Sequence, residues 1–171
     1  MHGPAVSGDF PEGSRPAVVA LGANLGDRAG TLRAALAELE ARGNVLIACS
    51  PFHETAPVGY LDQPDFINAT ALFGVPAGVS PEAFLAELLD VEKKFGRVRT
   101  FPNAPRTLDL DLIFFADETR DSPGLTLPHP RWRERAFVVE PLAEMLAALG
   151  DRVPACVAER VRDLNFSTRK S

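Results

Sequence analysis

Two carboxylates stand one residue apart in the most apolar stretch of this 171-residue chain, the segment PRTLDLDLIFF at 105–115. Alternation along a strand would put Asp109 and Asp111 on one face and the leucines between and around them on the other. Residues two apart on a strand are separated by about 6.5–7 Å, so both carboxylates can reach one ligand. Two like charges on a half-buried face repel each other unless a cation joins them. Hard oxygen donors without a neighbouring Cys and His set favour Mg²⁺ over zinc.

Three arginines precede the aspartates in the segment GRVRTFPNAPR at 96–106, namely Arg97, Arg99 and Arg106. A guanidinium is always charged and binds phosphate oxygens in a bidentate fashion. An acidic pair beside a basic loop is what a metal–nucleotide site needs, because carboxylates hold the metal and arginines hold the phosphates. Two plainer interpretations stay open: an edge strand with a solvated polar face, and salt bridges between this loop and the strand.

Two further polar residues are candidates for ligand contacts. Asn68 lies in the strand-like segment DFINATALFGV, where a buried amide needs partners and can offer both a donor and an acceptor to the edge of a heterocycle. His129, in LPHP, can donate to phosphate or can serve only the structure of its turn. The sequence contains neither G-x-x-x-x-G-K-[ST] nor G-x-G-x-x-G, so it supports neither a P-loop nor a dinucleotide-binding turn.

The elements that must position these residues follow a β-α-β-β-α-β order. We expect strands at 17–21, 44–55, 65–75 and 107–115. We expect one helix from the N-cap Asp27 to Gly43, a second from Ser80 to Gly96, and a third over 133–149 that is broken at Pro141. A functional loop is expected at 56–65 and a hairpin within 117–130. This order predicts an α+β, ferredoxin-like antiparallel sheet with both helices packed on one face, followed by a C-terminal extension.

Composition narrows the class of protein. The net charge is −5, which disfavours a general nucleic-acid or membrane binder, and no apolar run approaches the roughly 20 residues of a membrane span. Cys49 and Cys156 form no CxxC group, so we expect no zinc or disulfide scaffold, and a reducing cytoplasm with both thiols as small core residues. We expect a mobile extension without a secretory signal at 1–15, one domain at 16–166 and a polar tail at 167–171.

Four segments together resemble the 6-hydroxymethyl-7,8-dihydropterin pyrophosphokinase family of folate biosynthesis. They are ALGANLGDR, TAPVGYLDQPDFINA, GRVR…PRTLDLDLIFF and LTLPHPRWRERAFVVEPL, and the match runs in order from about Val18 to Leu142. The resemblance implies a ferredoxin-like fold and Mg²⁺-ATP as donor. It also implies transfer of the β,γ-diphosphoryl group to the CH₂OH of the pterin, with release of AMP.

The resemblance also implies roles for individual residues. Asp109 and Asp111 would bind two Mg²⁺ ions, and Arg97 and Arg106 would act with them on the phosphates. Glu92, Arg99, His129 and Arg135 would lie at the ATP site. Thr55, Ala56, Val58 and Asn68 would surround the pterin edge, and Phe66 and Phe137 would sandwich its ring. Pro102 and Asn103 stand where many relatives have a basic residue and a tryptophan.

The expected partners are ATP and the pterin alone, with no nucleic acid, no membrane and a monomeric chain. Two other functions use the same residues. A two-metal phosphodiesterase or nucleotidyl hydrolase would turn over with water and without a pterin. A non-catalytic ferredoxin-like binding module would bind a purine or pterin without metal and leave ATP unchanged. The pterin-loop and LPHP segments favour the pyrophosphokinase, because neither rival needs them.

Overall fold

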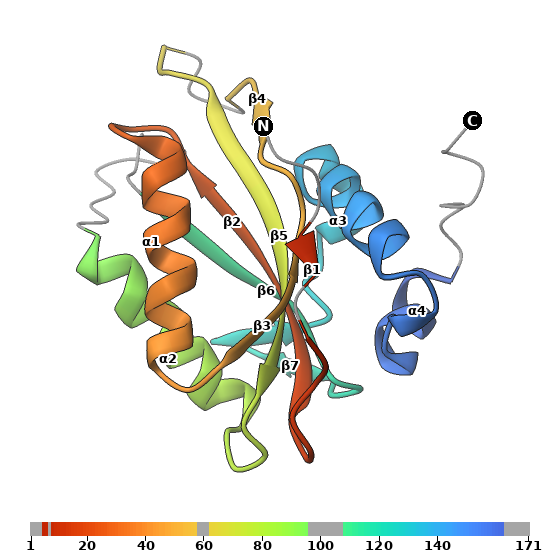
Figure 1. Cartoon of the computed structure of the whole chain (residues 1–171). Coiled ribbons are helices and arrows are strands. Elements are labelled where there is room, and N and C mark those ends of the chain that lie inside the picture. Colours follow the sequence, from red (N-terminus) through yellow and green to blue (C-terminus); the bar gives the residue numbers. More distant parts are fainter. Residues whose placement is uncertain (1–4, 7, 58–61, 96–107, 163–171) are drawn as a thin grey trace.

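A computed structural model describes residues 5–6, 8–57, 62–95 and 108–162 of the chain. The described residues form three layers, in which a central antiparallel sheet lies between one pair of helices and another (Figure 1). The strands of this sheet are β1 (Ala5–Val6), β2 (Arg15–Ala23), β3 (Val45–Cys49), β4 (His53–Thr55), β5 (Phe66–Val75) and β6 (Asp109–Phe115). The predicted α+β class is therefore confirmed.

The order of the strands across the sheet is β1-β3-β5-β2-β6, with β4 paired to the other end of β5. Each of these pairs is antiparallel, and β2 lies between β5 and β6. The predicted strand over 44–55 is two strands instead, β3 and β4, because Pro51 interrupts the pairing with β5. A separate hairpin of β7 (Arg120–Ser122) and β8 (Leu125–Leu127) confirms the hairpin predicted within 117–130.

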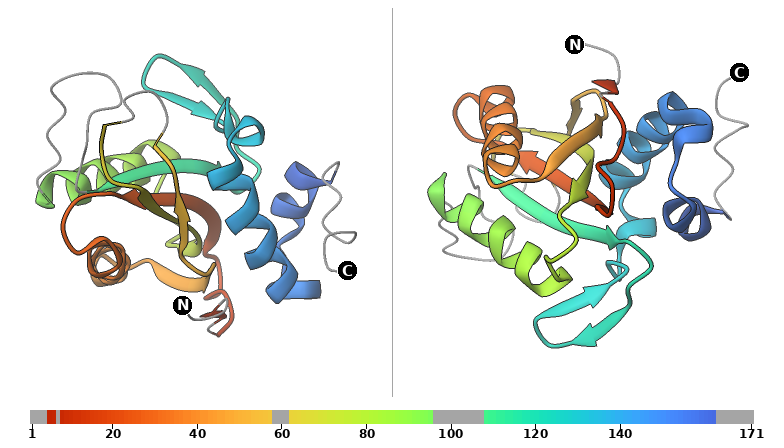
Figure 2. Two further views of the ribbon diagram at one scale, coloured as in Figure 1. Left: turned by 90° about the horizontal axis from the view of Figure 1, so that it is seen from above. Right: turned by 60° about the horizontal axis from the view of Figure 1, so that its bottom comes forward.

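Helices α1 (Arg28–Ala41) and α2 (Pro81–Lys94) cover the first face of the sheet (Figure 2). Both begin where local chemistry predicts. The Asp27 carboxylate accepts from the N–H of Gly30 at 3.1 Å, and the Ser80 hydroxyl accepts from the N–H of Ala83 at 3.0 Å. Pro81 then occupies the first helical position, where its missing N–H costs nothing.

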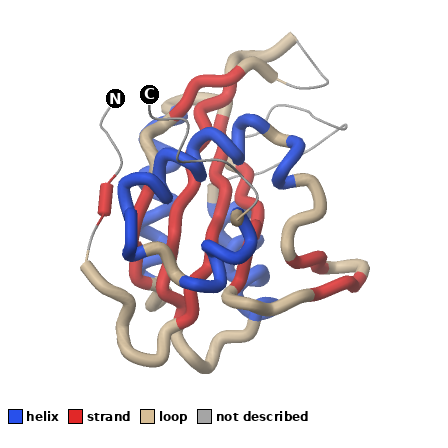
Figure 3. Tube along the Cα trace, turned by 90° about the vertical axis from the view of Figure 1, so that its right-hand side faces the viewer, coloured by secondary structure: helices blue, strands red, loops and turns tan. Residues whose placement is uncertain are grey.

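The second face of the sheet is covered by α3 (Ala136–Leu149) and α4 (Ala155–Val161), which lie across the strands in Figure 3. Short 3₁₀ turns at Trp132–Glu134 and Gly150–Arg152 flank α3. The predicted break at Pro141 is wrong, because α3 runs through it. A proline inside a helix costs about 3 kcal/mol. The buried side chains of Leu142 and Met145 each return about 1.5–3 kcal/mol against the sheet, so packing outweighs the lost bond.

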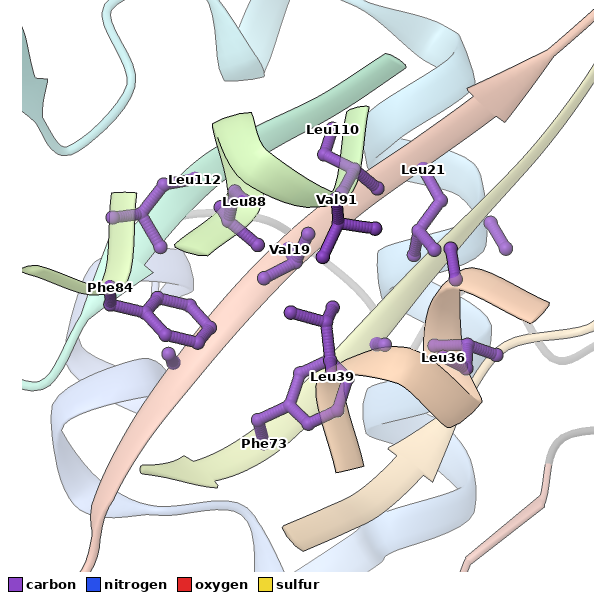
Figure 4. Close-up of a cluster of buried hydrophobic side chains, with 14 of the residues drawn as sticks. Val19, Leu21, Leu36, Leu39, Phe73, Phe84, Leu88, Val91, Leu110 and Leu112 are labelled. Carbon is purple, nitrogen blue, oxygen red and sulfur yellow. The ribbon is translucent and has the colours of Figure 1, made fainter. Parts of the chain in front are cut away.

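The larger core lies between the sheet and helices α1 and α2. Figure 4 shows Leu36 and Leu39 of α1 and Phe84 of α2 meeting strand residues such as Val19 and Phe73. The ring of Phe84 lies 6.5 Å from that of Phe73 and 5.9 Å from that of Phe115, centroid to centroid. Three aromatic rings at these separations join α2 to two strands of the sheet.

The start of the chain is attached to the sheet where it is described. β1 pairs with β3, with Val6 opposite Ala48, and so extends an edge of the sheet. Phe10 packs against the second core, and Arg152 donates to the carbonyl of Gly8 at 2.6 Å. Residues 1–15, which composition predicts to be a mobile extension, thus include a strand that covers the outer edge of β3.

We expect Phe84→Ala to destabilise the protein by about 3–5 kcal/mol, because it removes a fully buried ring and leaves a cavity between α2 and the sheet. Leu89→Ala on the same helix is the matched control, since Leu89 is 44% exposed and its loss should change stability by about 0.5 kcal/mol or less. Urea unfolding of both variants measures the difference. Equal losses would contradict the packing described for α2.

Candidate functional site

A row of three residues on the second face of the sheet connects the predicted metal-binding carboxylates to the predicted ligand-binding amide. The strand register places Gly22 of β2 opposite Asn68 of β5 on one side and opposite Asp109 of β6 on the other. Val18 and Ala20 belong to the second-face core, and Gly22 shares their side of β2 by alternation. Neighbouring strands are about 4.8 Å apart, so the backbones that carry the amide and the carboxylate lie about 10 Å apart, with a glycine between them.

The acidic half of the site follows the predicted alternation. Asp109 and Asp111 are half-buried on the second face, whereas Leu108, Leu110 and Leu112 are buried in the first core. An Oδ2 of Asp111 lies 3.6 Å from the Nη1 of Arg135, which stands at the start of α3. The structure therefore brings one predicted nucleotide-site arginine against one predicted metal-site carboxylate.

Two hydrogen bonds, one from the main chain and one to the ring, fix the position of His129 near this pair. Its N–H donates to the carbonyl of Ile113 on β6 at 2.9 Å, and its Nδ1 accepts from the N–H of Arg131 at 3.1 Å. The neutral ring therefore carries its proton on Nε2, which is left as a donor. Burial lowers the pKa of His129, and the positive charge of Arg135 lowers it further; the charge of Asp109 opposes this shift, and that of Arg131 adds slightly to it.

The start of α3 supplies one more predicted residue. Phe137 is half-buried against the second core, and the guanidinium carbon of Arg135 lies 5.6 Å from the centre of its ring. This distance is within the range of a cation–π contact. Arg135 is thus held between an aromatic face and the Asp111 carboxylate, which fixes the orientation of its planar group.

The amide half of the site is built on β4 and β5. Asn68 is 6% exposed, and its Nδ2 donates to the Oγ1 of Thr55, one of the predicted partners. Its Oδ1 faces Gly22, where an added Cβ would lie 2.9 Å from this oxygen and 3.8 Å from the ring of Phe66. Phe66 is half-buried on the same face as Asn68, and Ala56 follows β4 and is exposed. Gly22 is itself buried, and its missing side chain leaves the space that the Asn68 amide occupies.

Sequence reasoning missed the residues that anchor the chain just before β5. The buried Asn24 donates from Nδ2 to the Oε1 of Gln63 at 2.7 Å and to the carbonyl of Pro64 at 3.1 Å. Arg28 donates from Nη1 to the carbonyl of Asp65 at 2.7 Å. An Asn between glycines, followed by an Arg at a helix start, was the available signal. These contacts tie the end of the predicted functional loop to the turn between β2 and α1.

Glu92, predicted at the nucleotide site, lies on the last turn of α2 and is only 3% exposed. Its Oε2 accepts from the backbone N–H of Leu110 at 2.6 Å. Leu110 is the residue between the two aspartates, so Glu92 lies next to the acidic pair. Arg97, Arg99, Arg106 and Val58 were also predicted for the site and lie outside the described residues.

The carboxylates fit a hard divalent cation. In the described ranges, no three His, Cys, Asp or Glu side chains gather to hold a metal ion by themselves. A pair of half-buried carboxylates on one strand face is nevertheless the usual protein share of a Mg²⁺ site, because substrate phosphates and waters complete the shell. No helix within the described part of the chain has the length and apolarity needed to cross a membrane.

A family model and several known proteins that resemble the chain all belong to one family. Residues 18–147 match the family model of 7,8-dihydro-6-hydroxymethylpterin-pyrophosphokinase. The chain is similar to proteins of three bacteria that are each called 2-amino-4-hydroxy-6-hydroxymethyldihydropteridine pyrophosphokinase. That of Synechocystis is 42% identical over 138 residues, covering 80% of this chain and 69% of its own. That of Bacillus subtilis is 40% identical over 130 residues, covering 75% and 77%. That of Pseudomonas aeruginosa is 39% identical over 128 residues, covering 74% and 78%.

The lowered pKa of His129 predicts a pH effect on stability. Its contribution is fully present above the unfolded value of 6.5 and is lost as the pH falls from there through the lower folded pKa, because the unfolded chain binds the proton first. We expect the fall in unfolding free energy between about pH 7.5 and about pH 5.5 to be smaller in His129→Asn than in the natural chain. The Asn carbonyl can replace Nδ1 as acceptor. Equal falls, measured by urea unfolding, would contradict the burial described for this ring.

Proposed function

The chain belongs to the 7,8-dihydro-6-hydroxymethylpterin-pyrophosphokinase family and is an ATP-dependent pyrophosphokinase of folate biosynthesis, and from this premise we propose how its residues carry the reaction. It transfers the diphosphoryl group of ATP to the hydroxymethyl group of 6-hydroxymethyl-7,8-dihydropterin and releases AMP. The observation that supports our assignment of the site is the row Asn68–Gly22–Asp109. An amide able to bind a heterocycle edge stands there two strands from a carboxylate able to bind a metal.

On the acceptor side, the pterin lies with its polar edge toward Asn68, whose amide Gly22 accommodates. The amide Oδ1 accepts from ring N–H groups, and Nδ2, which gives one of its two N–H groups to Thr55, can donate the other to the pterin edge. Thr55, Ala56 and Val58 complete the edge contacts. The rings of Phe66 and Phe137 cover the two faces of the pterin, as flat aromatic ligands require. The half-burial of both rings, with Phe66 next to Gly22 and Phe137 next to Arg135, supports this placement.

On the donor side, Asp109 and Asp111 hold two Mg²⁺ ions together with the ATP phosphates. When bound, these ions offset the negative charge of the phosphate oxygens. His129 donates from Nε2 to a phosphate oxygen without adding charge, since its pKa is lowered. Arg135, already oriented by Phe137 and Asp111, contacts the ribose or phosphates. Arg99 lies at this ATP site, Glu92 supports the site from α2 through the backbone of Leu110, and Arg97 and Arg106 contact the transferred phosphates.

In the chemical step, a bond forms between the hydroxymethyl oxygen and the β-phosphorus while the bond from that phosphorus to the α,β-bridging oxygen breaks. The leaving group is AMP, and the proton of the hydroxyl is released. The protein performs little covalent chemistry in such a transfer, so its work is to align the oxygen and the phosphorus and to neutralise charge. The separation of the two half-sites by two strands sets this alignment.

We further propose that the fold is of the ferredoxin-like class. Its support is the βαββαβ order, the strand sequence β6-β2-β5-β3 and the placement of α1 and α2 on one face. The domain spans 16–166, with a polar tail at 167–171. The free thiols of Cys49 and Cys156 support a cytoplasmic location. Val45 and Leu89 are the exposed large apolar residues in the described ranges, which supports a monomer that does not bind a membrane. The net charge of −5 supports small-molecule substrates rather than nucleic acid.

The products of the reaction test the function directly. We expect purified protein to form AMP from ATP only when both Mg²⁺ and 6-hydroxymethyl-7,8-dihydropterin are present, as measured by chromatography of the nucleotides. Release of ADP, or turnover without the pterin, would instead indicate a hydrolase. Binding of the pterin with ATP left intact would indicate a non-catalytic module.

Replacement of either aspartate tests the metal role. We expect Asp109→Ala and Asp111→Ala each to reduce turnover at least about 100-fold, because each removes a charged ligand from a site completed only by substrate. Thermal unfolding should change little, since both side chains are half-buried rather than part of a core. Near-normal steady-state rates in both variants would reject the role of this pair.

A further inference from the structure

Within the described ranges, Glu92 is the only buried residue of the charged types Asp, Glu, Lys and Arg. Burying a carboxylate is unfavourable unless hydrogen bonds compensate for the lost water. A buried, apolar side chain would satisfy the helix stripe of α2, in which Leu88 and Val91 already face the core. The acidic residue at this position therefore needs a specific purpose, and its contact with Leu110 supplies one.

We propose that Glu92 is a positioning residue that sets the separation and direction of the Asp109 and Asp111 carboxylates. Its Oε2 accepts from the N–H of Leu110 at 2.6 Å, a short, charge-assisted bond. Leu110 is covalently joined to both aspartates, so a bond that holds its backbone also constrains the backbone atoms from which their side chains project. Whatever fixes this one residue fixes the pair.

The strand needs this support because β6 is the last strand of its sheet in the described part of the chain, where it pairs with β2 alone. An edge strand has ladder hydrogen bonds on one side only. From α2, Glu92 holds the backbone N–H of Leu110, while Val91 and Leu88 share the first core with its 4% exposed side chain. Helix α2 therefore holds Leu110 in two ways, by the hydrogen bond to the main chain of Leu110 and by the core that surrounds the side chain of Leu110.

This inference rests on the proposed role of Asp109 and Asp111 as metal ligands. Groups that orient metal ligands typically change metal affinity or activity by about 10–100-fold when they are replaced. The proposal depends on the reach of an acceptor oxygen to the Leu110 N–H, and the charge of Glu92 only strengthens that bond. Reach and charge can be separated by two conservative substitutions.

The experiment measures binding of Mn²⁺, as a probe for Mg²⁺, to the full chain in the presence of α,β-methylene-ATP, with free Mn²⁺ followed by electron paramagnetic resonance. Glu92→Gln keeps an acceptor oxygen at the same reach and removes the charge. Glu92→Asp keeps the charge and withdraws the oxygen by one methylene. We expect Glu92→Asp to weaken Mn²⁺ binding about 10-fold and Glu92→Gln to stay within about threefold of the natural chain.

Two controls separate this inference from the proposed function. Glu87→Gln, on the same helix, alters a half-buried carboxylate that accepts from Asn44 at 2.9 Å, and should leave Mn²⁺ binding unchanged. Asp111→Asn should weaken it strongly. Normal binding in Asp111→Asn would reject the metal site itself. Weak binding in Asp111→Asn with normal binding in Glu92→Asp would overturn the positioning role alone.

Two more outcomes also decide the inference. If Glu92→Gln binds Mn²⁺ as weakly as Glu92→Asp, or more weakly, the charge matters rather than the bond to Leu110, and the proposal fails. If a variant does not fold, hydrogen exchange of the natural protein decides. We expect the Leu110 amide to exchange as slowly as the amides of β6 that bond to β2. Exchange at the rate of an exposed amide would overturn the proposal.

Discussion

The hydrogen-bonded register of β2 between β5 and β6 is the constraint on which the site depends. It sets Gly22 between Asn68 and Asp109, and so fixes the distance between the strands that carry the two half-sites. A slip of one residue would turn every side chain of β2 to the other face. Val19 and Leu21 would then leave the first core, so the burial of those residues enforces the register that the site needs.

Helix α3 serves the core and the site at once. Val138, Leu142 and Met145 hold it against the second face, and Arg135 and Phe137 at its start reach the region of the aspartates. His53 of β4 also bonds to Glu144 of α3, Nε2 to Oε1 at 2.5 Å, which ties the amide half of the site to the same helix. Both halves are therefore positioned by elements whose stability comes from buried apolar contacts.

The sequence was most informative where the controlling interactions are local. Alternation on one strand was enough to place Asp109 and Asp111 on a common face, and side-chain chemistry was enough to start helices at Asp27 and Ser80. Pro141 was misread because the packing that carries a helix through a proline comes from the sheet, which is distant in sequence.

The candidate site was less predictable because it depends on contacts between strands. No local pattern tells which residues of β5 and β6 will lie opposite Gly22, so the row from Asn68 to Asp109 follows only from the register. The burial of Glu92 was partly readable, since it follows Leu88 by four residues on the apolar stripe of α2. Its partner, the backbone of Leu110, has no signature in the sequence.

Gly22 also affects how the protein could escape an inhibitor. A compound that binds the Asn68 amide would depend on an amide position that only a glycine at position 22 permits. Any replacement of Gly22 adds a Cβ only 2.9 Å from the Oδ1 of Asn68, and so disturbs the amide proposed to bind the natural substrate as well. At this position, a change that excludes the compound would also impair the enzyme.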